Sequence, residues 1–179
     1  MQSRIPRQSA GESDDRRPDV AGLDDRFEAE LAAAVSGARR RAVRDGDRQI
    51  DTAHLLHSLL EADAEVRAVL GDGARIARLL GYLVQRSIGY GLRWQSAVED
   101  SGAVPVVTGA TGFSPLAAAA TEAARARAVR RGAARVCGVD LLAALVADPQ
   151  ARAVEVLARA AVEPDVVLAR VEQRFEPAP

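Results

Sequence analysis

The sequence is short of several residue types, and each shortage excludes something. Only one of the 179 residues is a cysteine, Cys137, so no disulfide can form within the chain and a reducing compartment fits best. Aromatic residues make up 3% of the chain, so small aliphatic side chains, alanine above all, must fill the core. All 24 basic residues are arginine and lysine is absent, a bias typical of a GC-rich genome and therefore weak evidence for phosphate binding.

Membrane, nucleic-acid and nucleotide functions are also disfavoured. No apolar run is long enough to span a bilayer, and the polar stretch 1–19 lacks the apolar core of a signal peptide, so we expect a cytoplasmic protein. The net charge of −1 argues against a dedicated nucleic-acid surface. A chain without lysine cannot carry a Walker A motif, and Gly109-Ala-Thr-Gly112 lacks the Gly-Lys-Ser/Thr ending, so ATP hydrolysis is not expected.

The order of residues indicates helices after a polar leader. Residues 1–22 have almost no apolar content and predict a disordered segment. From there, apolar residues recur three and four positions apart, as on one face of a helix that Asp24 or Asp25 begins and Gly46 ends. The residues on that face are Phe27, Leu31, Ala34, Val35, Ala38, Ala42 and Val43. Further helices are expected after Ile50, over 65–70 and over 74–86.

The second half repeats the first at an offset of 86 residues. Subtracting 86 places Phe113 on Phe27, Ala120 on Ala34, Gly132 on Gly46 and Leu141 on Leu55. Self-similarity at a fixed offset is the most specific signal in the sequence. It predicts an all-α fold built from two copies of one helical repeat, 23–86 and 113–176.

The segment between the repeats, 87–112, has a different character. It holds five glycines, the only tryptophan (Trp94) and the β-prone run Val104-Pro-Val-Val-Thr108. The first interpretation is a long Gly-rich loop whose aromatic residues pack back onto the helices. The alternative is a short hairpin that covers a groove between the repeats.

Matching motifs occur at the same places in both copies. Arg26-Phe-Glu-Ala-Glu30 and Phe113-Ser-Pro-Leu-Ala117 open the repeats, an arginine-rich stretch ends each first helix at Gly46 or Gly132, and Asp51-Thr-Ala-His-Leu-Leu56 is answered by Cys137-Gly-Val-Asp-Leu-Leu142. Their order and spacing resemble the Clp N-terminal domain, the double repeat at the front of ClpC, ClpA and ClpB unfoldases. The resemblance covers 24–86 and 113–175. It implies two pseudo-symmetric four-helix repeats packed into one domain, here as a stand-alone protein without the ATPase modules.

The resemblance also implies binding sites. In some ClpC proteins a motif glutamate holds the guanidinium of a phosphoarginine mark, but Ala53 and Val139 stand at that place, and neither side chain accepts a hydrogen bond. Recognition of phosphoarginine by this route is therefore disfavoured. The family's peptides and some cyclic-peptide antibiotics dock where the two repeats meet. The ligand patch expected there consists of Leu23, Asp24, Phe27, Val35 and Phe113; alternatively, the phenylalanines form interface core only.

Arginines occupy equivalent positions in the two copies and suggest a second binding surface. Arg39, Arg41 and Arg44 correspond to Arg125, Arg127 and Arg130. They form either a solvated face that complements the negative ends of the helices or a surface for anions and acidic peptides.

Metal and covalent chemistry have little support. His54 and His57 share a helix face, but zinc would need a further ligand such as Cys137 from the other repeat. The simpler reading is that His54 packs beside the helix start, His57 is solvated and Cys137 is a small hydrophobe. We predict no metal, no cofactor and no catalytic residue.

These observations favour a non-enzymatic, Clp N-domain-like binding protein. Its expected partners are peptides, client proteins or peptide-like antibiotics, and its expected role is that of adaptor or decoy for a ClpC-type protease system, including ClpC and ClpP. The alternative is a transcriptional or sigma-factor regulator that binds DNA or protein through its arginine-rich helix ends.

Overall fold

The computed structural model describes residues 27–87, 99 and 112–176, and in these ranges it contains eight helices and two short strands. The first repeat comprises α2 (Ala29–Asp45), β1 (Gln49–Ile50), α3 (Thr52–Ala62), α4 (Ala64–Leu70) and α5 (Gly73–Ser87). The second comprises β2 (Gly112–Phe113), α6 (Pro115–Arg130), α7 (Gly138–Ala147), α8 (Arg152–Arg159) and α9 (Pro164–Phe175). The all-α prediction is confirmed. The expected leader and most of the segment between the repeats lie outside the described residues.

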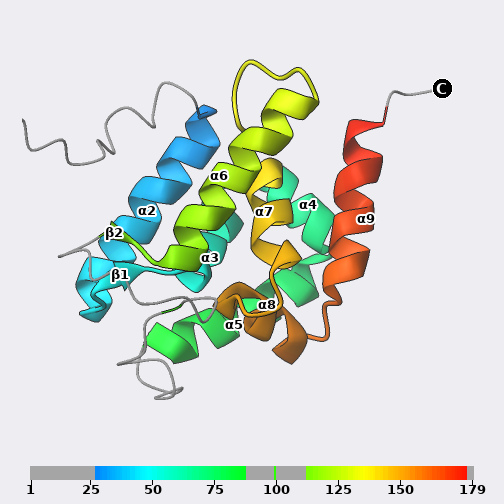
Figure 1. The fold of residues 1–179 in the computed structure, drawn as a ribbon. Coiled ribbons are helices and arrows are strands. Elements are labelled where there is room, and N and C mark those ends of the chain that lie inside the picture. Colours follow the sequence, from blue (N-terminus) through cyan, green and yellow to red (C-terminus); the bar gives the residue numbers. More distant parts are fainter. Residues whose placement is uncertain (1–26, 88–98, 100–111, 177–179) are drawn as a thin grey trace, which may run out of the picture.

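Helices α3 and α7 form the centre of the fold (Figure 1). Helix α2 packs on α3 and helix α6 packs on α7, so the two copies have the same internal arrangement. Helix α3 also contacts α8 of the second repeat, and α7 contacts α4 of the first. Every residue of α3 from Thr52 to Leu60 is buried. The two repeats therefore share one hydrophobic core.

Alanine allows the outer helices α2 and α6 to lie close to the centre. Each buries a row of alanines that are equivalent at the offset of 86, and their short side chains add little bulk between helices. The rows are Ala34, Ala38 and Ala42 in α2, and Ala120, Ala124 and Ala128 in α6. Val43, expected on the same face, is 59% exposed, and its equivalent Val129 is 75% exposed. The placement of Val43 was wrong because the position after the buried row already points away from the core.

The first helix of each repeat ends in the same turn. Gly46 and Gly132 both have a φ of 72°, the left-handed conformation that glycine adopts at no steric cost. In each turn the next backbone N–H donates to a carbonyl five residues back, Asp47 to Ala42 and Ala133 to Ala128, at 2.9 Å in both. The identical geometry at equivalent positions is direct evidence of the duplication.

Backbone pairing crosses between the repeats. Strand β2 pairs in parallel with β1, with Phe113 opposite Ile50, and Phe27 makes the equivalent bridge to Val136. The N–H of Ser114 donates to the carbonyl of Ile50, and the N–H of Glu28 donates to that of Val136, both at 2.9 Å. The start of each repeat is thus held by the other one, and the pseudo-symmetric arrangement is confirmed.

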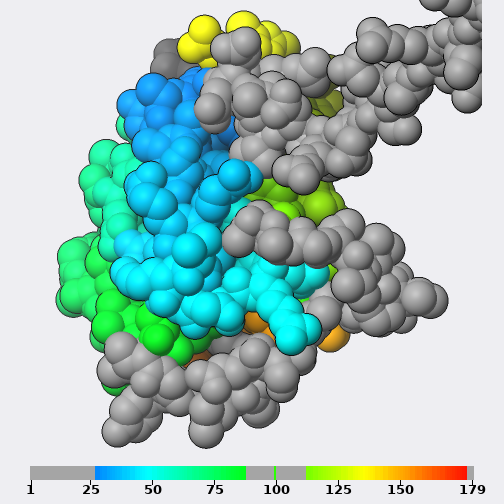
Figure 2. Space-filling model, turned by 90° about the vertical axis from the view of Figure 1, so that its left-hand side faces the viewer, coloured from blue at the N-terminus to red at the C-terminus, as the bar shows by residue number. Residues whose placement is uncertain are grey.

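From the side shown in Figure 2, α2 and the turn leading to β1 make up much of the coloured face, with α5 below them. In the part of the chain that the structure describes, no helix has both the length and the apolar character that a bilayer crossing requires.

Candidate functional site

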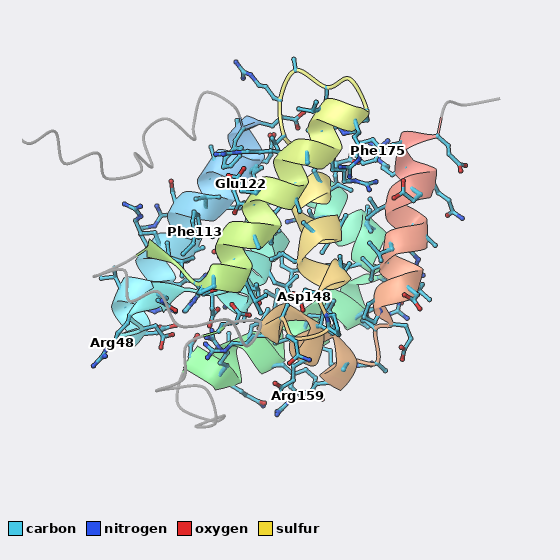
Figure 3. All side chains as sticks on the ribbon, viewed as in Figure 1. Arg48, Phe113, Glu122, Asp148, Arg159 and Phe175 are labelled. Carbon is cyan, nitrogen blue, oxygen red and sulfur yellow. The ribbon has the colours of Figure 1, made fainter. Side chains whose placement is uncertain are left out.

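The predicted ligand patch is not an open surface at its centre. Phe27 is only 2% exposed and Val35 only 4%, so both belong to the core. The guanidinium of Arg125 lies over the Phe27 ring, 5.8 Å from its centroid. Phe113 alone is half-buried (Figure 3), while Leu23 and Asp24 lie outside the described ranges. In a chain with so few aromatic residues, Phe27 packs in the hydrophobic core.

Most of the predicted arginine surface is neutralised within the fold. Arg39 and Arg130 have no ion-pair partner among the described residues, whereas the other four arginines contact carboxylates. The pairs are Arg41–Glu61, Arg44–Asp45, Arg125–Glu122 and Arg127–Glu172. The pairing of Arg127 holds the pKa of Glu172 below its usual value. A surface for anions needs uncompensated positive charge, and these arginines provide little of it.

The residues considered as metal ligands, His54, His57 and Cys137, have separate surroundings. His54 lies 3.0 Å from a carboxylate of Asp47 through Nε2, whereas His57 contacts Glu61, and Cys137 lies against Asp140. His57 was expected to be solvated, but it is buried, and burial together with the nearby Arg41 lowers its pKa to about 4. It therefore stays neutral at neutral pH.

A cluster of Asp45, Asp47 and His54 has its ligand atoms within 4.8 Å of one another. However, Nδ1 of His54 accepts a hydrogen bond from the N–H of Asp51 at 3.1 Å, so a neutral ring carries its proton on Nε2. That nitrogen, which lies 3.0 Å from an Asp47 carboxylate oxygen, then has no lone pair for a metal. Burial opposes protonation of His54, but its hydrogen bonds with Asp47 and Asp51 outweigh burial and raise its pKa.

A pocket of about 440 Å³ lies between the two repeats. We call it the open junction. Its walls come from the starts of α2, α4 and α7, the turn before α7 and the end of α9. The first repeat contributes four acidic side chains, which we call the acidic wall: Glu28, Glu30, Asp63 and Glu65. The second repeat contributes Arg131, Arg174, Phe175, Cys137 and Val139.

The arginines of the open junction are already paired. Arg174 donates to Glu65 at 2.6 Å, and Arg131 makes two hydrogen bonds to the buried Asp140, at 2.6 and 3.0 Å. The hydrogen bonds with Asp140 raise the pKa of Arg131. For Asp140 the opposing effect of burial is outweighed by Arg131, so its pKa falls.

Phe175 forms the aromatic side of the pocket. The Arg131 guanidinium lies over its ring at 4.4 Å from the centroid, which fixes both side chains. Figure 3 shows Phe175 at the far end of α9, beside the end of α6 and among side-chain nitrogens. A partly exposed ring next to carboxylates is a suitable surface for the aliphatic stem of a long basic side chain.

The acidic wall keeps an excess of negative charge. Glu28 and Glu30 are exposed and have no ion-pair partner within the described ranges. Asp63 is buried and caps α4 by accepting the N–H groups of Glu65 at 2.8 Å and Val66 at 3.2 Å. The open junction therefore suits a cationic group better than an anionic one.

Cys137 at the floor of the open junction is not activated. Burial raises the pKa of its thiol to about 11, and its sulfur lies 3.2 Å from Asp140 Oδ2. A protonated thiol is a poor nucleophile and a poor metal ligand. Its role is to begin α7, where its N–H donates to Asp140 at 3.1 Å.

The equivalent region at the starts of α3, α6 and α8 is filled by protein. We call it the closed junction and define it by Asp51, Thr52, Ser114 and Arg152. Asp51 caps α3 by accepting the His54 N–H at 2.9 Å, and it contacts Arg86 of α5 and Arg152 of α8. Burial would raise the pKa of Asp51, but His54, Arg86 and Arg152 together hold it well below its usual range. This ionic network joins the two repeats.

Sequence reasoning missed the acidic wall of the open junction. Two local signals were present: Asp63 stands directly before a helix, as a capping residue does, and Gly138 opens α7. A Cβ on Gly138 would lie 2.0 Å from Asp63 Oδ2, so glycine is required where the first repeat approaches the second. Neither signal showed that the start of α2 and the end of α9 would meet there.

No family model matches the sequence, and no curated protein matches it. Solved structures do match the fold. The N-terminal domain of the Clp chaperone ClpD from Arabidopsis thaliana has a TM-score of 0.63 at 20% identity, covering 86% of this chain and 96% of that one. The Hsp104 N-terminal domain from Candida albicans has a TM-score of 0.62 at 12% identity, covering 83% and 91%.

A third match is the N-terminal domain of the ClpV1 ATPase from the Sci1 type VI secretion system of Escherichia coli. Its TM-score is 0.58 at 22% identity, covering 88% of this chain and 87% of that one. At these identities the likeness establishes the fold. The chain has the fold of Clp N-terminal domains over most of its length.

Proposed function

We propose that this chain is a non-enzymatic binding protein that recognises a peptide or client protein through the open junction. The observation that carries the proposal is a pocket built by both repeats whose acidic wall keeps uncompensated carboxylates beside an aromatic ring. Such a pocket suits an extended segment with an arginine or lysine side chain, whose stem lies on Phe175 and whose charge faces Glu28 and Glu30.

The fold supports a binding role. One solved structure of this fold, 20% identical over 90% of this chain, is named for a peptide from the SciI protein of the EAEC type VI secretion system. We extend peptide recognition to this chain on the basis of its own pocket. The cyclic-peptide antibiotics expected at the phenylalanine patch are less well supported, because Phe27 is buried.

A defined probe tests the ligand class. We expect acetyl-Ala-Leu-Arg-Leu-Ala-amide to bind in a calorimetric titration and the same peptide with neutral citrulline in place of arginine to bind at least about tenfold more weakly, a difference of about 1.4 kcal/mol. The double variant Glu28→Gln/Glu30→Gln should lose the preference for arginine. Because exposed charges are screened, added salt should weaken binding of the arginine peptide.

A matched control is available in α9. Glu163 and Asp165 occupy the same helix-start positions there as Glu28 and Glu30 do in α2, and they are equally exposed. The variant Glu163→Gln/Asp165→Asn should bind the probe like the wild type. Equal weakening by both double variants, or equal affinity for the arginine and citrulline peptides, would contradict the proposal.

The role in a protease system is tested separately. An adaptor should bind purified ClpC and accelerate degradation of a captured client by ClpC and ClpP. A decoy should compete with the ClpC N-terminal domain for the same ligand and slow that degradation. If the chain neither binds ClpC nor changes the degradation rate, both roles are wrong, whatever the result of the peptide titration.

A further inference from the structure

One acidic residue between the repeats is held inside the closed junction. Glu99 is 4% exposed and lies at the starts of α3 and α8, which belong to different repeats. Both helices begin there with backbone N–H groups that have no acceptor within the helix, and both present their positive dipole ends. Burying a carboxylate is unfavourable unless its oxygens are fully hydrogen-bonded.

The Glu99 carboxylate meets that condition. Its Oε1 accepts the N–H of Arg152 at 2.7 Å and the hydroxyl of Thr52. Its Oε2 accepts the N–H of Thr52 at 2.8 Å and the hydroxyl of Ser114 at 2.7 Å. A carboxylate has about four sites for accepting hydrogen bonds, and here four donors fill them.

The two hydroxyl groups are oriented by the fold, independently of Glu99. Both residues are buried, and each hydroxyl oxygen accepts a backbone N–H: Thr52 from Ala153 at 3.0 Å, and Ser114 from Ala117 at 3.1 Å. Because each hydroxyl oxygen already accepts one hydrogen bond, its proton points in another direction, towards Glu99. The closed junction thus presents four preset donors and is built for an anion with two oxygens.

The open junction lacks this donor set. At the offset of 86, Gly138 takes the place of Thr52 and Glu28 takes the place of Ser114. Neither side chain donates a hydrogen bond, and Glu28 adds a negative charge. The closed junction therefore offers two hydroxyl donors that the open junction lacks.

We propose that the closed junction is a carboxylate-binding site that the chain fills with its own Glu99, so that only the open junction accepts a ligand from outside. Glu99 acts as an internal ligand and as an intramolecular competitor. Its removal converts the closed junction into a second binding site, selective for carboxylates over neutral groups of the same shape.

Chemical rescue of Glu99→Ala in the full-length chain tests this inference. The variant should melt at a lower temperature than the wild type, and millimolar acetate should raise its Tm by about 5 °C at concentrations well above half-saturation. Acetamide, the neutral analogue, should have no effect. Acetate should leave the wild type unchanged, because Glu99 already occupies the site.

A second variant and a local measurement separate this effect from general stabilisation. Glu99→Gln keeps the side-chain volume, so it should lose stability but show no response to acetate. In NMR spectra, acetate should return the backbone amide signals of Thr52 and Arg152 in Glu99→Ala towards their wild-type positions. If Glu99→Ala is unfolded without acetate, the titration is read as recovery of helical circular dichroism.

Two results would overturn the inference: equal effects of acetate and acetamide on Glu99→Ala, or equal effects of acetate on Glu99→Ala and the wild type. Neither result bears on the peptide proposed for the open junction, which is tested by the substitutions of Glu28 and Glu30. The two proposals can therefore fail separately.

Discussion

The closed and open junctions occupy equivalent places in the fold and present opposite chemistry. In the closed junction, Thr52, Ser114 and Arg152 direct hydrogen-bond donors at one carboxylate. In the open junction, the equivalent helix starts carry acceptors, and the arginines that line it are paired with Glu65 and Asp140. One junction binds an anion supplied by the chain, and the other leaves negative charge facing solvent.

The comparison shows which features a duplicated fold keeps and which it changes. The crossed backbone hydrogen bonds are the same length in both copies, because they set the geometry that lets the repeats share a core. The side chains beside those bonds differ at each position. The equivalent pairs are Asp51 and Cys137, Thr52 and Gly138, His54 and Asp140, and Ser114 and Glu28. Binding chemistry has diverged on a conserved backbone.

The largest expected effect comes from the buried acids. Asp51→Asn keeps a good capping residue but removes the buried carboxylate that Arg86 and Arg152 share, which should cost about 3 kcal/mol of unfolding free energy. Asp140→Asn should cost less, about 1–2 kcal/mol, because Arg131 is exposed and water can solvate it. Urea unfolding measures both. Equal losses of unfolding free energy would contradict the inference that the network around Asp51 is the more deeply buried of the two.

Acid sensitivity should reside in the first repeat. Because the pKa of His57 is lowered to about 4, the unfolded chain binds the extra proton first, and stability should fall as the pH drops from 6.5 to 4, by at most about 3 kcal/mol. Ala143 takes its place in the second repeat. Unfolding of His57→Ala should therefore depend less on pH across that window, although the variant is less stable throughout.

His54 provides the control for that prediction. Its pKa is raised, so its contribution has the opposite sign: it is complete below pH 6.5 and is lost as the pH rises through the folded-state value. The two windows do not overlap. An unchanged slope between pH 4 and 6.5 in His57→Ala would place the acid sensitivity elsewhere.

Gly138→Ala tests the close approach of the repeats at the open junction. The added Cβ would meet Asp63 Oδ2 at 2.0 Å, so Asp63 or α7 must move, at a cost of about 1–3 kcal/mol. Gly81→Ala is the matched control, because nothing lies within 4 Å of its Cβ; it should stabilise α5 by about 0.5–1 kcal/mol. Thermal unfolding distinguishes the two. A neutral Gly138→Ala would mean that Asp63 moves freely.

The smallest expected difference concerns the two equivalent helix starts. Ser114 caps α6 through its hydroxyl, so Ser114→Ala should cost about 1 kcal/mol. Glu28 makes no side-chain cap to α2, so Glu28→Ala should change the unfolding free energy by less than about 0.5 kcal/mol. Chemical denaturation of the two variants under the same conditions measures the difference. A larger loss for Glu28→Ala would assign that residue a structural role.

Features that depend on local periodicity could be predicted from the sequence. The duplication, the end of α2 at Gly46 and the start of α9 at Pro164 all follow from residue spacing and turn preferences. The partners of the arginines could not be predicted in this way. Arg127 pairs with Glu172, 45 residues away, and only the packing of both α6 and α9 on α7 brings them together.

The burial of single residues could not be predicted from the sequence either. His57 lies among leucines in α3, a helix that is covered on all sides, so periodicity gives it no solvent face. The open junction draws residues from α2, α4, α7 and α9, and the donors of the closed junction meet a residue 47 positions away in the chain. Sites formed by such distant segments require the tertiary arrangement.

The crossed pairing of strands has a consequence for synthesis of the chain on the ribosome. When the first repeat emerges, the carbonyl of Ile50 has no partner until Ser114 has been made. In the same way, the N–H of Glu28 has no partner until Val136 has been made. The nascent first half therefore exposes an unpaired backbone edge and the apolar faces of α3 and α4 during translation of the second. Both crossed backbone hydrogen bonds therefore require that the second half of the chain has been made.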